Sequence, residues 1–265
     1  MNGPDHNKVM WITGASSGIG AALSIHCSRL GYRLILSSRD EPKLEEVKDK
    51  CLHPDKVRVL PLDLAEAETL QEKVSKAVDF FGIVDILVNN GGISQRSLVK
   101  HTQLSVDRRL MEINYFGTVA LTKALLPHFI QQKSGHFAVV SSLVGKFGSP
   151  YRSSYAASKH ALHGFFDSLR AEHHQDAILV TMICPGFVKT DVSVNALTGD
   201  GSPLNQMDDA QAKGLPPEEC AKAMEKAIRL KRQEVYIGRK EVFGVYLKRF
   251  FPSAFSNFIK KAKVR

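Results

Sequence analysis

The chain has 265 residues with 43% hydrophobic and 24% charged side chains, enough for one large α/β domain with a substantial core. Its four cysteines and ten histidines show neither paired nor ligand-type spacing, so we expect a reducing compartment, no disulfide framework and no metal site. No apolar run approaches the roughly 18 residues of a membrane span, and the first, at residues 9–12, is too short for a signal peptide.

The net charge of +9 is uneven, because residues 240–265 contain seven basic residues against the single acid Glu241, and so carry +6 of it. The rest of the chain is nearly neutral, which argues against nucleic acid as a partner. We expect a cytoplasmic protein, with peripheral membrane contact through the basic C-terminal residues as an alternative. The basic residues are Lys240, Lys248, Arg249, Lys260, Lys261, Lys263 and Arg265.

An apolar strand is predicted at residues 8–13, followed by a glycine-rich turn and a helix that ends before Gly31. This is the context of a phosphate-binding loop, since glycines let the backbone approach a pyrophosphate and the helix N-terminus donates N–H groups. The turn also fits the GxSxG nucleophile elbow of serine hydrolases with Ser16 as nucleophile, but that interpretation leaves Gly20 unexplained. The turn residues expected to face a dinucleotide are Gly14, Ser16, Ser17, Gly18, Ile19 and Gly20.

A second strand at residues 33–38 ends at Ser38 and Arg39. An acidic residue at this point binds the ribose 2′-hydroxyl of NAD, whereas an arginine accommodates the 2′-phosphate of NADP, so we expect NADP as the cofactor. A helix at 41–51 and a strand at 57–61 come next, and Asp63 and Leu64 follow that strand. Asp63 either caps the next helix or binds an adenine amino group. After a helix at 66–81 and a strand at 84–88, the turn Asn89-Asn90-Gly91-Gly92 is typical of close approach to a ligand.

The chemistry is predicted around Tyr155 and Lys159, which lie four residues apart on a helix expected at residues 153–174. Four residues rise about 6 Å along a helix and share one face, so the ammonium can favour the phenolate and make Tyr155 a proton donor and acceptor. Tyr236 and Lys240 have the same spacing but are expected on a strand, where four residues span about 13 Å. Upstream, Asn114 lies in a mostly helical stretch at 104–132, where an asparagine is disfavoured unless it has a function.

The remaining predicted elements complete an alternation of strands and helices from residue 8 to residue 237. This pattern predicts an α/β fold, a Rossmann-type doubly wound parallel sheet of about seven strands with helices on both faces. Residues 1–239 are expected to form one NADP-binding domain, in which the polar stretch 191–214 is a substrate lid. The elements are strands at 136–140, 178–184 and 235–237 and a helix at 217–230.

The tail, residues 240–265, places apolar and aromatic residues at helical spacing, and Pro252 interrupts the stripe, so we expect two short helices there. A basic helix with an aromatic face can lie on an anionic membrane. The alternative is that the stripe packs on the domain or on a neighbouring subunit beside the lid. Our hypothesis is that the aromatic face is partly open and touches either a lipid-like substrate or a membrane.

In combination, these motifs resemble the short-chain dehydrogenase/reductase family over residues 8–190. One departure from the family pattern is the turn after Asn90, where glycine replaces the usual alanine at Gly91. The matching landmarks are residues 13–20 (TGASSGIG), Asp63, residues 89–92 (NNGG), Asn114, Ser142, Tyr155, Lys159 and the Pro185-Gly186 pair.

The resemblance implies a role for each motif residue. Tyr155 would protonate the carbonyl oxygen, Ser142 would hydrogen-bond that oxygen, and Lys159 would lower the tyrosine pKa and hold the nicotinamide ribose. Asn114 would keep a water in a proton relay. The implied catalytic residues are Asn114, Ser142, Tyr155 and Lys159. The implied cofactor contacts are Gly14, Ser16, Ser17, Gly18, Ile19, Gly20, Ser38, Arg39, Asp63, Leu64, Asn90, Gly91, Gly92, Tyr155, Lys159, Pro185, Gly186, Val188 and Thr190.

The expected activity is therefore NADP(H)-dependent interconversion of a small ketone or aldehyde and an alcohol. A cofactor-binding scaffold without activity and a serine hydrolase are the alternatives. Stretches such as 193–196 (SVNA) resemble a subgroup with lipid-like substrates that is anchored by a hydrophobic N-terminal segment, which we do not expect here. The family commonly assembles as homodimers or homotetramers through the two long helices before and after Ser142.

Overall fold

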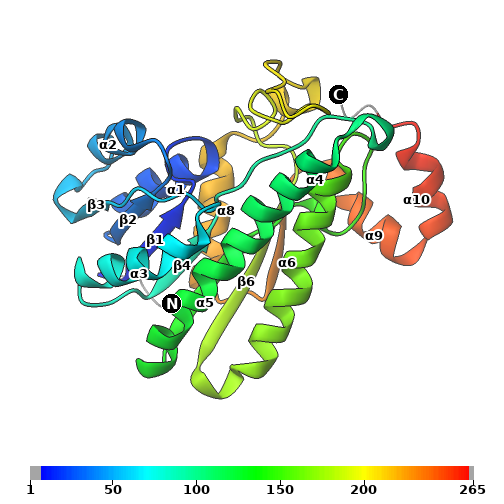
Figure 1. The fold of residues 1–265 in the computed structure, drawn as a ribbon. Coiled ribbons are helices and arrows are strands. Elements are labelled where there is room, and N and C mark those ends of the chain that lie inside the picture. The colour runs from blue at the N-terminus through cyan, green and yellow to red at the C-terminus, as the bar shows by residue number, and fades with distance from the viewer. Residues whose placement is uncertain (1–6, 263–265) are drawn as a thin grey trace.

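The computed structural model describes residues 7–262, and they form a seven-stranded parallel sheet with helices on both faces (Figure 1). The strand order β3-β2-β1-β4-β5-β6-β7 confirms the predicted Rossmann-type doubly wound sheet. Every strand except the edge strands β3 and β7 is almost wholly buried, which explains their continuous apolar runs. The strands are β1 (Val9–Thr13), β2 (Arg33–Ser37), β3 (Val57–Val59), β4 (Ile86–Asn89), β5 (Gly135–Val140), β6 (Ile178–Pro185) and β7 (Glu234–Ile237).

The helices form two layers. Helices α1, α2 and α8 pack on one face of the sheet, and α3, α5 and α6 pack on the other. The bounds are α1 (Gly18–Arg29), α2 (Glu41–Asp49), α3 (Leu70–Asp79), α4 (Leu104–Met111), α5 (Gly117–Gln131), α6 (Ser153–Glu172), α7 (Asp209–Ala212), α8 (Pro217–Arg229), α9 (Phe243–Phe250) and α10 (Pro252–Ile259).

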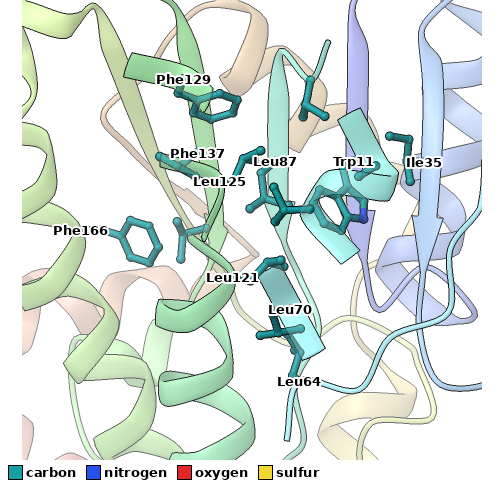
Figure 2. Close-up of a cluster of buried hydrophobic side chains, with 14 of the residues drawn as sticks. Trp11, Ile35, Leu64, Leu70, Leu87, Leu121, Leu125, Phe129, Phe137 and Phe166 are labelled. Carbon is teal, nitrogen blue, oxygen red and sulfur yellow. The ribbon is translucent and has the colours of Figure 1, made fainter. Parts of the chain in front are cut away.

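One of the two main core clusters fills the space between the sheet and the α3/α5/α6 layer (Figure 2). Trp11 lies on β1 opposite Ile35 of β2 and Leu87 of β4, and all three side chains are fully buried. The indole Nε1 of Trp11 donates a hydrogen bond of 2.8 Å to Ser37 Oγ, which donates in turn to the carbonyl of Leu60 at 2.6 Å. This relay satisfies the one polar atom of the largest core side chain.

Two predicted helices begin or continue differently from the expectation. The helix expected at residues 66–81 begins only at Leu70, because Ala67–Thr69 forms a 3₁₀ turn. The helix expected across 104–132 is divided into α4 and α5 by a π-helical turn, Glu112–Phe116, which holds Asn114. Pro127 is tolerated inside α5. A π-turn inserts one residue into the helical ladder, and such turns are frequent at functional sites.

The strand order reverses beside β1, since β2 follows β1 on one side and β4 lies on the other. In open α/β sheets this switch point, at the carboxyl ends of the strands, is where ligands bind. The loops that follow β1, β2, β4, β5 and β6 all begin at this edge of the sheet. These loops carry the motifs found in the sequence.

The two helices expected in the tail are confirmed as α9 and α10, which stand apart from the sheet (orange and red in Figure 1). Pro252 opens α10, where its missing N–H and fixed φ are compatible with a first helical turn. Lys263 and Arg265 lie outside the described residues. Across residues 7–262, no helix has both the length and the apolar character that crossing a membrane requires.

Candidate active site

A cavity of about 1500 Å³ opens at the carboxyl ends of the strands and brings most of the predicted site residues together. Of those residues, only Gly20 and Asn114 do not line it. No histidine is among its lining residues in the described part of the chain, so the lining offers no serine–histidine pair to support the hydrolase interpretation. Tyr236 is also absent from the lining, and its hydroxyl donates to Glu234 on β7.

The glycine turn after β1 keeps the backbone close to the cavity. Gly14 has a φ of +64°, and Asn90 Nδ2 donates to the carbonyls of Thr13 at 2.9 Å and of Gly14 at 3.2 Å. A Cβ on Gly20 would lie 2.2 Å from Gly14 O, so that position accepts only glycine without a backbone shift, although it does not itself face the cavity.

The first turn of α1 leaves its N–H groups available to a ligand. Ser17, the N-cap residue, makes no side-chain capping hydrogen bond, and the first turn contains no acidic residue. Ser16, Ser17, Gly18 and Ile19 line the cavity at this helix end. Free N–H donors and the positive end of the helix dipole suit a phosphate group, so the residues present fit a dinucleotide pyrophosphate.

At the far end of the cavity, Arg39 follows Ser38 and is 61% exposed. Its nearest anionic partner is Asp63, with 4.0 Å between Nη1 and Oδ2, so the guanidinium is only loosely held. Asp40 is engaged by Lys43, which donates to it from both the backbone N–H at 3.1 Å and Nζ at 2.7 Å. Lys43 also lines the cavity and was not predicted from the sequence, because a lysine in the first turn of a charged helix gives no distinctive signal.

Ser142, Tyr155 and Lys159 meet on one wall of the cavity, Ser142 from the end of β5 and the other two from α6. Burial raises the pKa of Tyr155, and the Ser142 hydrogen bond together with nearby arginine charges opposes that increase. Burial lowers the pKa of Lys159 to about 8. Its Nζ donates to the carbonyl of Val140 at 2.8 Å and lies 5.9 Å from the centre of the Tyr155 ring.

Asn114 lies behind this wall and is fully buried. Its Nδ2 donates to Ile93 O at 2.9 Å and to Ser158 Oγ at 3.0 Å, and its Oδ1 accepts from the Ile93 N–H at 2.8 Å. A Cβ on Gly92 would approach Asn114 Oδ1 to 2.8 Å and Lys159 Nζ to 3.6 Å. The π-turn therefore presents the amide to the loop after β4, and a glycine at position 92 makes this close approach possible.

Three buried charged residues of the cavity region were missed in the sequence: Arg96, Arg152 and Asp208. Arg96 and Arg152 line the cavity beside Tyr155. They come from separate segments, so no local spacing in the sequence connects them. A buried polar network of this kind becomes visible only when the fold brings its members together.

The other walls are formed by the expected lid and by the tail. Residues Asp191, Val192, Asn195, Leu197, Pro203 and Gln211 come from the stretch 191–214. The inner sides of α9 and α10 add Phe243, Leu247, Phe255, Phe258 and Ile259. The ring of Phe255 is 4% exposed and lies 5.0 Å from that of Phe147, between centroids. This part of the cavity is apolar, in contrast to the wall that holds Tyr155.

Comparison with known proteins identifies the family of the chain. The short chain dehydrogenase family model matches residues 8–200. A Drosophila melanogaster protein named dehydrogenase/reductase SDR family protein 7-like is 42% identical and covers 97% of this chain and 81% of its own length. The Xenopus tropicalis dehydrogenase/reductase SDR family member 7B is 41% identical, over 96% of this chain and 84% of that protein.

Solved structures show the same fold. An alcohol dehydrogenase from Thermococcus sibiricus, complexed with 5-hydroxy-NADP, superimposes with a TM-score of 0.74 at 27% identity, covering 88% of this chain and 97% of the other. A short chain dehydrogenase/reductase from Burkholderia phymatum in complex with NAD gives a TM-score of 0.83 at 21% identity, over 100% and 99% of the two chains.

Proposed function

The chain belongs to the short chain dehydrogenase family of oxidoreductases, and from this premise we propose that it uses NADP(H) to interconvert a ketone or aldehyde and an alcohol. The observation that carries the proposal is the shared cavity, in which Ser142, Tyr155 and Lys159 face the same space as the glycine turn and the open end of α1.

In this proposal Tyr155 is the general acid of reduction and the general base of oxidation, and Ser142 hydrogen-bonds the substrate oxygen as charge develops on it. When bound, the nicotinamide dinucleotide supplies the hydride. Lys159 holds the nicotinamide ribose and favours the phenolate, with the N–H donors of Nζ that its hydrogen bond to Val140 O leaves available. Asn114 supports a proton relay through Lys159, from its place behind Gly92.

The residues that we propose to hold the dinucleotide follow the cavity from one end to the other. The turn after β1 and the N-terminus of α1 hold the pyrophosphate, Asp63 and Leu64 border the adenine, and Arg39 with Ser38 binds the 2′-phosphate. The remaining proposed contacts are Asn90, Gly91, Gly92, Pro185, Gly186, Val188 and Thr190.

Arg39 supports NADP over NAD because its guanidinium is exposed, permanently charged and only loosely held by Asp63, whose Oδ2 lies 4.0 Å away. We expect NADPH to bind at least about tenfold more tightly than NADH, since a charge-assisted phosphate contact contributes roughly 1.5–3 kcal/mol before solvent screening. Arg39→Asp should reverse the preference in a fluorescence titration. Equal affinities of the unaltered protein for the two cofactors would refute the assignment.

The substrate that we propose is a small carbonyl compound with a lipid-like, apolar body. The support is the apolar wall formed by the tail and Phe147. Residues 191–214 act as a substrate lid in this proposal, within one domain that spans residues 1–239. A homodimer or homotetramer through α5 and α6 is the proposed assembly, and the 50% exposed ring of Phe116, just before α5, favours a partner there.

We also propose a cytoplasmic location with peripheral membrane contact through the tail. Tyr246, Phe250 and Phe251 are about half exposed or more, and Lys248 and Arg249 lie beside them on α9. Aromatic rings flanked by basic residues are typical of helices that lie on an anionic membrane.

The reaction is tested by a screen of carbonyl compounds with NADPH. The turnover of the Tyr155→Phe variant is then measured with the best substrate found. We expect this variant to lose at least about a hundredfold in turnover, because it removes the proton donor, and to keep NADPH binding. Tyr236→Phe is the matched control and should leave turnover unchanged. Binding of NADPH without turnover of any compound would favour the scaffold alternative.

A further inference from the structure

A buried ion cluster lies against the wall that holds Tyr155. Arg96 Nε is 2.5 Å from Asp208 Oδ2, and the two side chains are 2% and 1% exposed. Arg152 Nη2 is 3.4 Å from the same oxygen, with its own side chain 5% exposed. Arg96 Nη1 also donates to Ser94 Oγ at 2.8 Å and to Gln95 O at 2.7 Å. We call Arg96, Arg152 and Asp208 the arginine–aspartate cluster.

The cluster is fixed relative to Tyr155 by its neighbours. Gln95 Oε1 accepts hydrogen bonds from the backbone N–H groups of Ser154 at 2.9 Å and Tyr155 at 3.3 Å, so the residue next to Arg96 caps α6. Arg152 is the N-cap residue of the same helix, three residues before the tyrosine. The segment around Arg96 and the beginning of α6 therefore form one rigid unit.

The same cluster fastens the stretch 191–214. Asp208 belongs to that stretch, and its carboxylate is the group that both arginines share. The backbone adds two hydrogen bonds: the backbone N–H of Arg96 donates to Leu197 O at 2.8 Å, and the backbone N–H of Leu197 donates to Ser94 O at 2.9 Å. The stretch is thus held beside Tyr155 by a short backbone ladder and by a buried ion pair.

The cluster brings two guanidinium groups to the same carboxylate oxygen, Asp208 Oδ2. Burial removes the water that would screen the charge of each guanidinium group, so a nearby group that becomes anionic is stabilised. The phenol of Tyr155 is such a group, and Arg96 and Arg152 both act against the increase in pKa that burial imposes on it. Burial lowers the pKa of Arg152 to about 10, and the charge of Arg96 adds to that decrease.

We propose that the arginine–aspartate cluster is the positioning device of the active site: it fastens residues 191–214 to the beginning of α6 and supplies guanidinium charge that favours the phenolate of Tyr155. This inference rests on the proposed function, in which Lys159 favours the phenolate of Tyr155. It assigns part of that effect to the arginine–aspartate cluster.

Other charged groups border the same cavity and have to be distinguished from the cluster. Lys159 is directed at Val140 O, and Asp107 on α4 accepts from Ser154 Oγ. Arg109 on α4 lines the cavity but is exposed to solvent, which screens its charge. The other charged residues that line the cavity are Arg39, Asp40, Lys43, Asp63, Asp191, Lys240 and Glu241.

The test is a titration of Tyr155 itself, read as the ultraviolet difference between each protein and the same protein carrying Tyr155→Phe. We expect Arg96→Gln to move the midpoint of the phenol to higher pH by about one unit, the lower end of the roughly 1–3 units that a close opposite charge produces. Asp208→Asn removes the anion and should move the midpoint in the opposite direction. Arg109→Gln is the matched control and should leave it in place.

The opposite signs matter because a purely structural role would disturb the site similarly in both variants. The proposal is overturned if Arg96→Gln leaves the midpoint unchanged, if both cluster variants move it in one direction, or if Arg109→Gln moves it as far. Should Arg96→Gln fail to fold, Arg152→Gln carries the same expectation, since Asp208 then keeps Arg96 as its partner.

A second readout separates this proposal from the proposed function. The pH dependence of 2-octanol oxidation with NADP should show the same shifts as the titration, because the phenolate is the base in that direction. Asp208→Asn should also raise the KM for the alcohol more than it lowers kcat, since it releases residues 191–214. Failure of all carbonyl and alcohol probes would count against the proposed function alone, while the titration of the unloaded protein would still decide the role of the cluster.

Discussion

Lys159 is buried with its ammonium group against a backbone carbonyl, and this arrangement should cost the fold stability. Burial lowers the pKa of Lys159 from 10.5 to about 8 in the folded chain. At about 1.4 kcal/mol per pH unit, that difference corresponds to about 3 kcal/mol of destabilisation wherever the lysine must be charged in the folded state. We therefore predict that Lys159→Met, which fills similar space without a charge, raises the free energy of unfolding near pH 7.

The sign follows from proton binding. Below pH 8 the lysine is charged in both states, and the folded state bears the whole cost of burying it. Between pH 8 and 10.5 the unfolded chain binds more protons than the folded one, so the stability contributed by this group rises with pH and the cost disappears. The lost hydrogen bond to Val140 O costs roughly 1–3 kcal/mol at every pH, which leaves a net gain of about 0–2 kcal/mol at pH 7.

The assay is urea unfolding of both proteins at pH 7 and pH 10, followed by the fluorescence of Trp11, the one tryptophan of the chain. The advantage of the variant should shrink by about 2–3 kcal/mol between the two pH values. The exposed Lys100→Met is the control, and its difference from the unaltered protein should not depend on pH. A stability difference for Lys159→Met that is the same at both pH values would refute the argument.

Three further predictions test other parts of the structure. Gly20→Ala should weaken NADPH binding by about tenfold or more in a fluorescence titration, because its Cβ would displace the backbone at Gly14, whereas Gly148→Ala meets no atom within 4 Å and should not. Ser37→Ala should lower the free energy of unfolding in urea by about 1–3 kcal/mol, since Trp11 Nε1 and Leu60 O lose their partner; an effect no larger than that of the exposed Ser75→Ala would contradict this. Replacing both Phe250 and Phe251 by serine should weaken co-sedimentation with phosphatidylserine vesicles about tenfold in a salt-sensitive manner, whereas Leu52→Ser, at a residue 60% exposed elsewhere, should not.

Much of the fold could be predicted because a parallel sheet covered on both faces leaves a strong signal. Its strands are continuous apolar runs between turn residues, and the alternation with helices determines the class. The π-turn at Glu112–Phe116 could not be predicted, since the apolar pattern on either side of it is helical and only the hydrogen-bond pattern changes. That turn positions Asn114, whose side-chain amide forms two hydrogen bonds with the backbone of Ile93.

The site likewise contains residues that could be predicted from the sequence and residues that could not. Residues that follow strands, such as Ser142 and Arg39, are predictable because parallel strands deliver their carboxyl ends to one edge of the sheet. Arg96 and Asp208 are separated by 112 positions and meet only through the fold. In the sequence, each of the two residues looks like an ordinary surface charge. Only the burial of both side chains in the structure shows that they form an internal ion pair.

The tail shows how two interpretations that excluded each other in the sequence become compatible in three dimensions. The apolar residues of α9 and α10 are divided between two sides: Phe255 packs against Phe147 and borders the cavity, while Phe250 and Phe251 remain 68% and 64% exposed. Packing on the domain and an open aromatic surface are therefore properties of the same two helices.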